Sequence, residues 1–500
     1  MLDAALSALG TLLTPYHMGM LIFGVMVGLL IGILPGLGGI VGMSILLPFV
    51  PHLEAQAAFA MLIGMVAVIP TSDTFPSVLM GIPGSSGSQA TILDGFPLAK
   101  RGEAARAFGA AFSASLAGGL FGAAVLTLIL PIARPIVLAF ASPELFMLAL
   151  LGLSMVGVLS GRHVLKGLVA AGLGLMMGTL GAAPAVTVYR YTLDIPYLTD
   201  GIPLVVVGLG LFALPEIIDL LIKGTAISDV PGLGKGWWDG VHDTIRHKWI
   251  VLRCSAIGVI VGFLPGLGGT VVDWISYGHV IQTTPKGDRN GFGKGDIRGV
   301  IAPESSNNAK ESGGLIPTLL FGIPGSGSMA IFLGGIFLLG IEPGPGMMKD
   351  NLDLVYTAIW SLAFANIFGT GICLVLSRPI TKLTFIPFKT LAPLLIMIIV
   401  LAAYQGTRDW GDFLALLVTG IMGWLMKRFG WPRPAALIGY VLSDTTESYL
   451  FISVQRYGAD WLLRPGVLIL GLIIALSVGT GIFWQAQRRN SGEKTESLEK

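Results

Sequence analysis

Long apolar segments alternate with short polar stretches along nearly the whole chain. A membrane-spanning helix needs about 20 mostly apolar residues, and several segments reach that length while others are too short to cross alone. The pattern predicts an all-α polytopic membrane protein with broken helices and re-entrant helical hairpins. The apolar segments fall roughly at 17–34, 37–50, 56–75, 107–130, 143–161, 164–182, 202–222, 249–264, 266–281, 311–341, 354–377, 390–403, 412–426, 435–452 and 465–484.

Composition agrees with this class and excludes others. The 500 residues are 53% hydrophobic and 12% charged, whereas soluble domains carry about 25% charged residues. Many of the 70 Gly and some of the 29 Pro lie inside apolar segments, where they mark helix breaks and close packing. A net charge of +2 gives no support for a nucleic-acid partner, and two cysteines, Cys254 and Cys373, predict neither a disulfide framework nor a metal site. We expect the N-terminus to form a first membrane helix and no cleaved signal peptide.

Three landmarks recur in the same order, which indicates two related halves. The run GLLIGILPGLGG at Gly28–Gly39 returns as GVIVGFLPGLGG at Gly258–Gly269. The run PSVLMGIPG at Pro76–Gly84 returns as PTLLFGIPG at Pro317–Gly325. A third, spaced landmark pairs Pro203, Gly208 and Glu216 with Pro434, Gly439 and Glu447.

Basic residues in the loops favour an inverted arrangement of these halves. Lysine and arginine in short loops mark the cytoplasmic side. Loops 100–106, 162–166 and 223–248 are basic, while their second-half counterparts 342–353 and 404–412 are not. Conversely, 286–298 and 427–433 are basic, while 51–56 and 183–200 carry almost no basic residues. This swap predicts two inverted-topology repeats with a substrate site near the midplane; accidental variation in loop charge is the alternative.

The predicted organisation follows from the repeats. We expect a first membrane repeat over 1–222, a connecting cytoplasmic loop over 223–248, a second repeat over 249–455, a final transmembrane helix over 456–485 and a cytoplasmic tail over 486–500. Arg488 and Arg489 place the C-terminus in the cytoplasm. The expected location is the cytoplasmic (inner) membrane of a prokaryote, with the lipid bilayer on all sides.

The LPGLGG runs cannot continue a regular helix. Proline removes a backbone donor and glycine permits positive φ, so carbonyls freed at such a break can coordinate a cation. The alternative for these runs is a tight turn between packed helices. Asp73, just before the first serine-rich run, is a further candidate cation ligand, and its alternative is a solvated loop end. The predicted cation-binding positions, with Na⁺ as a possible ion, are Pro35, Gly36, Gly38, Gly39, Asp73, Pro265, Gly266, Gly268 and Gly269.

Two serine-rich runs, Gly81–Thr91 and Gly322–Ala330, are predicted hairpin tips. Their serines lie where a new helix would start, so hydroxyls, backbone N–H groups and a positive dipole end come together. Such a cradle can hold a carboxylate without arginine or lysine, although ordinary N-capping uses the same residues. The predicted substrate-binding residues are Ser85, Ser86, Ser88, Asn307, Asn308, Ser326 and Ser328.

The stretch Glu304–Ser312 is polar within an apolar chain. Asn307 and Asn308 can donate and accept hydrogen bonds in a cavity, and Glu304 and Glu311 can serve a proton or cation. For Lys310 and Glu311 the favoured interpretation is a solvated cytoplasmic loop. We also expect Asp94 to cap the next helix, and Glu216 and Glu447 to act as interfacial anchors.

Enzyme signatures are missing from the sequence. It has no HExxH motif, no GxSxG nucleophile elbow and no Walker phosphate loop. We therefore expect no enzymatic activity and no cofactor apart from a coupling ion, Na⁺ or H⁺. A passive anion channel and, less favoured, an intramembrane enzyme are the alternative functions.

Three runs resemble the large membrane subunit of the tripartite tricarboxylate transporters. They are LPGLGG at Leu34 and Leu264, DGFPLAKRGEAARA at Asp94–Ala107, and GDIRGVIAPESSNNAKESGGLIPTLLFGIPGS at Gly295–Ser326. The resemblance implies a cation-coupled importer of citrate or other organic carboxylates. Its implied partners are a small four-helix membrane subunit and a periplasmic solute-binding protein. The family's usual Tyr-Gly-Gly-Ser-type run before the first tip is replaced here by PTSDTFPSVLMGIPGSSGSQ at Pro70–Gln89.

Overall fold

The computed structural model is helical almost throughout. It describes residues 1–500 except 35, 160–163, 187, 224–232, 267, 384–387 and 499–500. The first half contains α1 (Leu2–Leu12), α2 (Pro15–Ile33), α3 (Gly38–Leu46), η1 (Leu47–His52), α4 (Ala55–Ser72), α5 (Thr74–Met80), α6 (Thr91–Lys100), α7 (Ala104–Leu138), α8 (Ser142–Leu159), α9 (Val164–Gly178), β1 (Gly181–Ala182), β2 (Tyr189–Arg190), η2 (Pro196–Leu198), α10 (Leu204–Gly208), η3 (Leu209–Ala213) and α11 (Leu214–Lys223).

The second half repeats the helical character. It contains α12 (Trp237–Arg246), α13 (Lys248–Phe263), α14 (Gly268–Thr283), η4 (Lys286–Gly291), α15 (Arg298–Phe321), α16 (Gly327–Leu338), α17 (Pro345–Asp350), α18 (Leu352–Leu383), α19 (Phe388–Tyr404), α20 (Gly411–Arg428), α21 (Arg433–Tyr457), η5 (Asp460–Leu463) and α22 (Pro465–Leu498). The strands β1 and β2 form one short antiparallel hairpin in which Gly181 pairs with Arg190. Segment 223–248, predicted as a connecting loop, carries the helix α12 in its described part.

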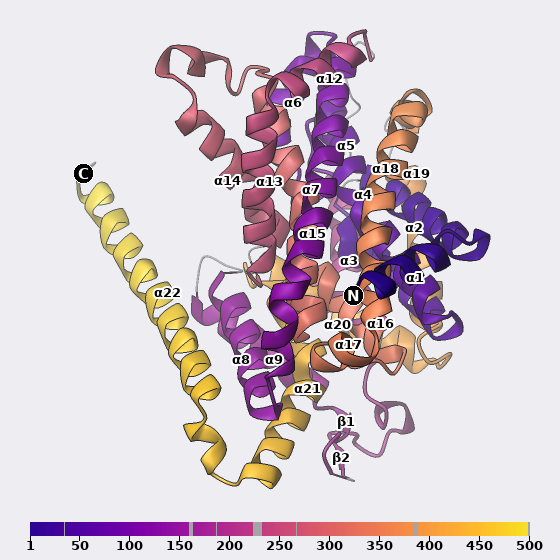
Figure 1. Ribbon diagram of the computed structural model, residues 1–500, viewed down its shortest axis with the longest axis vertical. Coiled ribbons are helices and arrows are strands. Elements are labelled where there is room, and N and C mark those ends of the chain that lie inside the picture. The colour runs from indigo at the N-terminus through magenta and orange to yellow at the C-terminus, as the bar shows by residue number, and fades with distance from the viewer. Residues whose placement is uncertain are drawn as a thin grey trace.

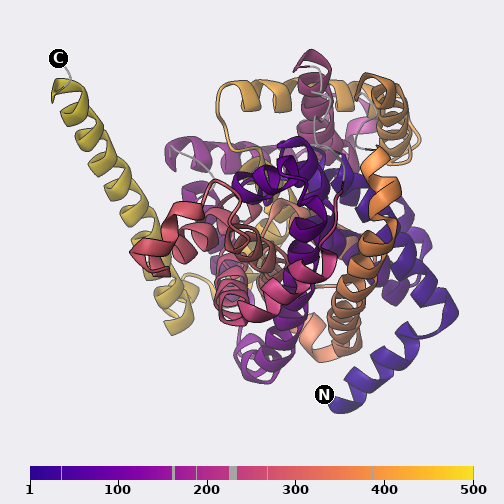
Figure 2. The same ribbon diagram turned by 90° about the horizontal axis from the view of Figure 1, so that it is seen from above.

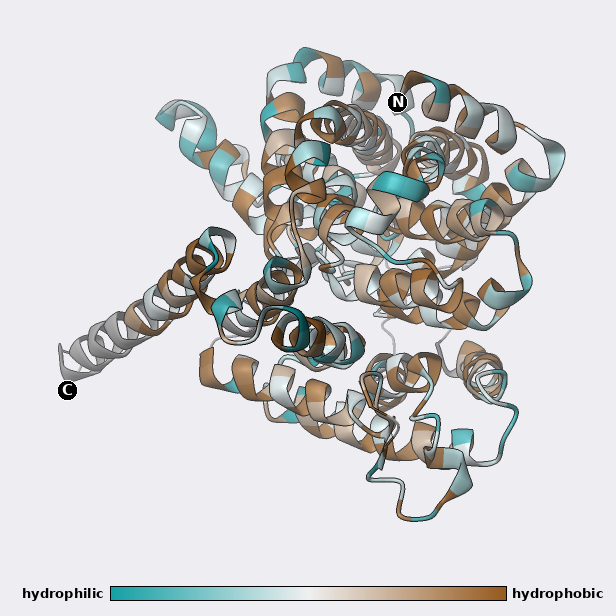
Figure 3. Cartoon of the chain, turned by 60° about the horizontal axis from the view of Figure 1, so that its bottom comes forward, coloured by the Kyte–Doolittle hydropathy of each residue, from teal (hydrophilic) through white to brown (hydrophobic). Residues whose placement is uncertain are grey.

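Within the described residues, five helices are long and apolar enough to cross a membrane: Pro15–Ile33, Ala55–Met80, Ala104–Leu138, Leu352–Thr381 and Pro465–Phe483. Shorter apolar helices, such as Val164–Gly178 and Gly327–Leu338, lie between them. Figure 3 shows apolar residues along most helices and polar residues mainly in the connections. The prediction of an all-α polytopic membrane protein is confirmed.

Each half contributes a helix pair that packs at very short range. In the first half α2 lies along α4, and in the second α13 lies along α15. The contacts rest on glycine: a Cβ at Gly24 would meet the Met61 carbonyl at 2.0 Å, and one at Gly258 would meet the Ser306 carbonyl at 2.4 Å. A long helix of each half also packs on the helix pair of the other half: α7 contacts α15, and α18 contacts α4. The two halves therefore share one interior.

The repeated runs adopt matching backbone conformations. Leu34 ends α2 at φ −83° and ψ 113°, and Leu264 ends α13 at φ −87° and ψ 110°. Gly36 and Gly266 follow at φ 82° and 89°. The tips match equally well, since Gly81 and Gly322 end their helices in the left-handed region at φ 65° and 67°. The two halves thus carry the same helix breaks, and their inverted orientation remains a prediction.

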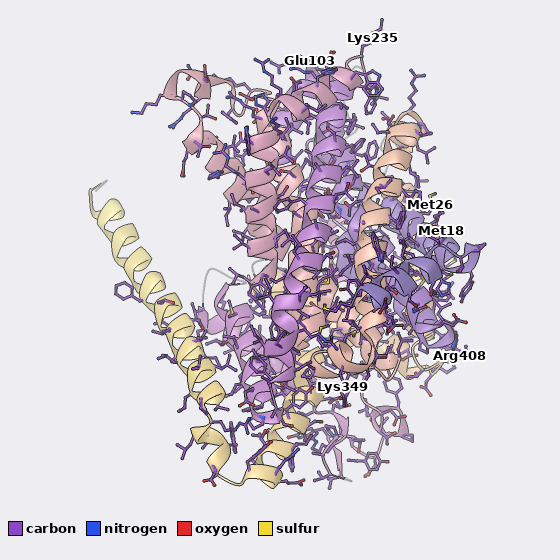
Figure 4. All side chains as sticks on the ribbon, in the orientation of Figure 1. Met18, Met26, Glu103, Lys235, Lys349 and Arg408 are labelled. Atoms are coloured by element: carbon purple, nitrogen blue, oxygen red, sulfur yellow. The ribbon has the colours of Figure 1, made fainter. Side chains whose placement is uncertain are left out.

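Contacts between loops follow the predicted sides of the membrane. Among the loops predicted to be cytoplasmic, Arg101 donates to the Gly295 carbonyl at 2.9 Å and Lys166 donates to the Phe429 carbonyl at 2.8 Å. Among those predicted outside, the Tyr197 hydroxyl donates to Asp412 at 3.0 Å. Figure 4 shows Glu103 and Lys235 together at one end, and Lys349 and Arg408 nearer the other. These contacts join loops that the sequence assigns to the same side, and the side itself stays a prediction.

The last helix, α22, stands apart from the rest of the molecule. Figures 1 and 2 show it in yellow, leaning away from the body along most of its length. In its apolar window only 11% of the residues are buried. It contacts mainly α8, and Arg464, which directly precedes α22, pairs with Glu144 of α8 at 2.7 Å. The interior that positions the functional residues therefore lies among the other helices.

Candidate functional site

A cavity of about 530 Å³ lies where the repeated motifs of the two halves meet. Both helix breaks reach it, through Gly36–Gly39 and Gly266, and so do both tips, through Ser85–Gly87 and Ser326–Ser328. Its wall combines apolar side chains, among them Ile40, Val66 and Phe212, with glycine backbone, serine hydroxyls and several charged side chains. The tertiary structure thus gathers four motifs that are far apart in the sequence.

The first tip is joined to the first break by backbone and side-chain contacts. The Gly36 N–H donates to the Gly84 carbonyl at 2.9 Å. The Ser85 hydroxyl donates to Asp73, and the Gly87 N–H donates to the Ser85 Oγ at 3.1 Å. Ser88 is buried and bonds to the Ser85 backbone, so it supports the tip and does not line the cavity.

The second tip begins a helix, as the sequence predicts, whereas the first does not. Ser326 is the N-cap of α16, and its side chain accepts a hydrogen bond from the Met329 N–H at 3.3 Å. The first-tip serines do not cap α6, which begins at Thr91 after Ala90 and has no side-chain cap. The prediction that the serines start a helix, and with it the N-capping alternative, is therefore wrong for the first tip, because a turn separates its serines from α6.

The tips and breaks touch across the two halves. A Cβ at Gly39 would meet the Ser328 Oγ at 2.5 Å, so the second tip lies directly against the first break. A Cβ at Gly87 would meet the Asn307 Oδ1 at 2.4 Å, so the first tip lies against the polar stretch of α15. An alanine at either position would therefore push the Ser328 or the Asn307 side chain aside, which gives both glycines a packing reason.

The polar stretch is a buried helix and not a loop. All of Glu304–Asn308 lies inside α15 with at most 1% exposure. Lys310 and Glu311, predicted to be solvated, have side chains only 12% and 9% exposed and form an ion pair. Both line the cavity. The solvated-loop prediction is therefore wrong, because α13, α14 and α7 cover α15.

Glu304 lies at the centre of a cage of hydroxyl groups. Thr74 of α5 donates to its Oε2 at 2.9 Å, Thr91 of α6 donates to its Oε1 at 2.7 Å, and Ser115 of α7 donates to its Oε2 at 3.1 Å. The three donors come from three helices. A buried carboxylate needs several hydrogen bonds to be tolerated, and these also fix the first tip against α15.

The predicted residues next to this cage have open hydrogen-bonding positions. Asn308 Nδ2 donates to Thr71 at 2.8 Å and to Asn366 at 2.9 Å, but its Oδ1 has no partner among the described residues. Among the residues that the structure describes, Asn307 also has no hydrogen-bond partner for Oδ1 or Nδ2, and Asp73 has none for Oδ1. Asp73 is fully buried, so it is no solvated loop end.

Eight of the predicted residues line the cavity, and four others that the structure describes are buried away from it. Those that line it are Ser85, Ser86, Ser326, Ser328, Gly36, Gly38, Gly39 and Gly266. Asp73, Asn307, Asn308 and Ser88 are buried behind the wall. Pro265 is buried beside the second break, Gly268 and Gly269 open α14, and Pro35 lies outside the described residues.

Comparison with known proteins identifies the family. The profile described as "Tripartite tricarboxylate transporter TctA family" matches residues 18–438. The chain belongs to this family. It is also 32% identical over 448 residues, 88% of this chain and 87% of the relative, to an "Uncharacterized 52.8 kDa protein in TAR-I ttuC' 3'region" of Agrobacterium vitis. An "Uncharacterized protein in TAR-II ttuC' 3'region" of the same organism is 33% identical over 193 residues, 39% of this chain and 79% of that protein. No solved structure matches the chain.

Membership in the TctA family makes the chain a subunit of a tripartite tricarboxylate transporter, as the resemblance predicted. The charged groups around the cavity are then of interest, and the sequence alone did not bring them together. Glu216, predicted as an interfacial anchor, instead lines the cavity and pairs with Lys427 at 2.7 Å and Arg433 at 2.9 Å. The prediction missed these two cations because they lie more than two hundred positions from Glu216 in the chain.

The predicted role of Asp94 also changes, whereas that of Glu447 as an interfacial anchor stays a prediction. Asp94 does not cap a following helix; it lies within α6 and accepts from the Gly295 and Asp296 N–H groups at 2.7 and 2.8 Å. Glu447, like Glu216, is held by an ion pair, with Arg190 at 2.8 Å. Both carboxylates therefore tie α6 or α21 to segments far away in the sequence.

Proposed function

We propose that this chain is the permease subunit of a cation-coupled secondary transporter that imports tricarboxylates or related organic carboxylate anions. The single observation that carries the proposal is the cavity in which both serine-rich tips meet Lys310, Lys427 and Arg433. Hydroxyls, helix-start N–H groups and cations are the groups that bind carboxylates. The family description supports the same substrate class.

The substrate is proposed to lie between the two tips. Ser85, Ser86, Ser326 and Ser328 offer hydroxyls from both sides of the cavity. Each of the three cations already has an acidic partner, Glu311 for Lys310 and Glu216 for the other two. An incoming carboxylate would compete with these acidic groups, so the cations tune affinity while the serines fix position.

The coupling cation, Na⁺ or H⁺, is proposed to bind near the helix breaks and Asp73. Broken helices at a repeat interface expose carbonyl groups suited to this task. The break positions Gly36, Gly38, Gly39 and Gly266 line the same cavity as the tips. We further propose a small four-helix membrane subunit and a periplasmic solute-binding protein as partners, in the inner membrane of a prokaryote with the C-terminus in the cytoplasm.

Reconstitution tests the proposal directly. The protein, with its two partners, is placed in liposomes, and uptake of labelled citrate and a panel of di- and tricarboxylates is followed under an imposed Na⁺ or H⁺ gradient. We expect accumulation above the equilibrium level without ATP. Uptake that persists after both gradients collapse indicates a passive channel, and a need for ATP contradicts the secondary mechanism.

A further inference from the structure

Buried polar atoms without partners gather beside the first tip. Asp73 is 0% exposed and Asn307 is 1% exposed. Within the part of the chain that the structure describes, Asp73 Oδ1 and both amide atoms of Asn307 have no hydrogen-bond partner. Because both amide atoms lack a partner, the observation is the same whichever way the amide is oriented. Native proteins rarely leave such groups unsatisfied, so these atoms are available to a bound ligand.

One short turn connects the two residues. Ser85 donates its hydroxyl to Asp73, and Gly87 donates its N–H to the same Ser85 Oγ at 3.1 Å. Gly87 in turn packs against the Asn307 amide, where a Cβ would lie 2.4 Å from Oδ1. Asp73 and Asn307 therefore flank the turn Ser85–Gly87, whose outer side lines the cavity.

Among the described residues no ion pair includes Asp73, and the lysine of α15 in this region, Lys310, is paired with Glu311. Glu304 gives the contrast, because three hydroxyl donors occupy its two oxygens. An ionised carboxylate inside a membrane protein requires a counter-charge. Of the carboxyl groups of Asp73 and Glu304, only that of Asp73 has an oxygen without a hydrogen-bond partner among the described residues, and this oxygen is available to a cation.

Two prolines interrupt the helical hydrogen bonding of α4 and α5 on either side of Asp73. Pro70 and Pro76 have no N–H, so the carbonyls of Val66 and Ser72 lose their regular helical donors. Such carbonyls, set free where a membrane helix is interrupted, are typical ligands of a transported cation. Asp73 lies between the prolines, at the junction of α4 and α5.

We infer that Asp73 and Asn307 form a binding site for one monovalent cation of the Na⁺ class, between the first tip and α15. This inference rests on the proposed function and deepens it, since it moves Asn307 from the substrate to the cation. One carboxylate with neutral oxygens suits a single positive charge, and the described residues contain no group of three His, Cys, Asp or Glu that could hold a multivalent metal. The second half has Gly314 at the spacing of Asp73, so it lacks the carboxylate.

The test measures cation binding separately from transport. The melting temperature of the purified, detergent-solubilised protein is followed against NaCl, with KCl and choline chloride holding ionic strength constant. A ligand that binds the folded state alone raises this temperature with concentration. We expect a Na⁺-specific rise in the native protein, and a half-maximal Na⁺ concentration at least about tenfold higher in Asp73→Asn and Asn307→Ala.

Asp412→Asn is the matched control, since it also neutralises a fully buried carboxylate, but one in α20 that is held by Tyr197 and Thr407. Its Na⁺ midpoint should stay native even if its baseline melting temperature falls. The inference is overturned if the native protein responds equally to Na⁺ and K⁺, if it responds to pH alone, or if both site variants keep the native midpoint. Asn307→Asp, which keeps an oxygen at the site, should retain the Na⁺ response and so separates ligation from folding.

Citrate uptake distinguishes this result from failure of the proposed function. Carboxylate transport that continues with native Na⁺ dependence in Asp73→Asn removes the cation site and leaves the transporter proposal intact. A Na⁺-specific stabilisation that depends on Asp73, without uptake of any carboxylate in the panel, preserves the site and removes the carboxylate proposal.

Discussion

At the residue scale, the two tips use the same residue types for different tasks. Ser326 both caps α16 and lines the cavity. Ser86 lines the cavity and is exposed, and it caps no helix. The sequence alone could not separate substrate binding from N-capping for these serines. The structure makes the two roles separable by mutation.

Replacing Ser326 by Ala should affect both stability and binding. Loss of the cap costs about 1 kcal/mol of unfolding free energy, and loss of a hydrogen bond to a charged ligand should weaken citrate affinity by roughly tenfold. Ser86→Ala should weaken affinity and leave stability native. Thermal unfolding and citrate binding, measured side by side, check both. Native affinity in a destabilised Ser326→Ala protein would assign that serine to capping alone.

At the scale of elements, glycine decides how closely helices approach. A Cβ at Gly24 on α2 would meet the Met61 carbonyl of α4 at 2.0 Å. In the second half, α13 and α15 form the corresponding helix pair, and a Cβ at Gly262 of α13 would meet the Lys310 carbonyl of α15 at 2.2 Å. Because Lys310 lines the cavity, the α13–α15 contact also sets the position of a site residue.

Gly24→Ala should destabilise the protein by about 1–3 kcal/mol, because α2 must move away from α4. Gly19→Ala on the same helix is the control, since nothing lies within 4 Å of its added Cβ. The control should be neutral or slightly stabilising, as alanine favours a helix over glycine. Thermal unfolding in detergent checks both. Equal melting temperatures would mean that α2 and α4 separate without cost.

At the scale of the whole molecule, the two halves share one interior and one cavity. The helix α7 packs on α15 and α18 packs on α4, so neither half completes its core alone. Both breaks and both tips face the same cavity. An arrangement of this kind fits a site that two repeats build together.

The inverted topology predicts which loops are reachable from outside the cell. Single cysteines in 344–349 and 184–200 should react with an impermeant maleimide in intact cells, while those in 286–294 and 100–103 should react only after permeabilisation. The native cysteines, Cys254 and Cys373, are buried and give a low background. Labelling of 286–294 and 344–349 from the same side would rule out the inverted repeat.

The sequence by itself determined the class of protein, the duplicated breaks and the two tips. The hydropathy of a segment and the backbone conformations that Pro and Gly allow are local properties, so they do not depend on the tertiary contacts. Hence Gly36 and Gly266 adopt matching conformations at the predicted positions.

Only the tertiary structure decided which polar residues are buried and what they contact. Burial depends on the helices packed around a segment, and sequence spacing does not report it. The sequence predicts that Lys310 and Glu311 are solvated, yet other helices cover α15 on several sides and bury both side chains. Glu304 finds its donors 230, 213 and 189 positions away, in Thr74, Thr91 and Ser115. The open atoms of Asp73 and Asn307 likewise became visible only once every neighbouring partner was placed.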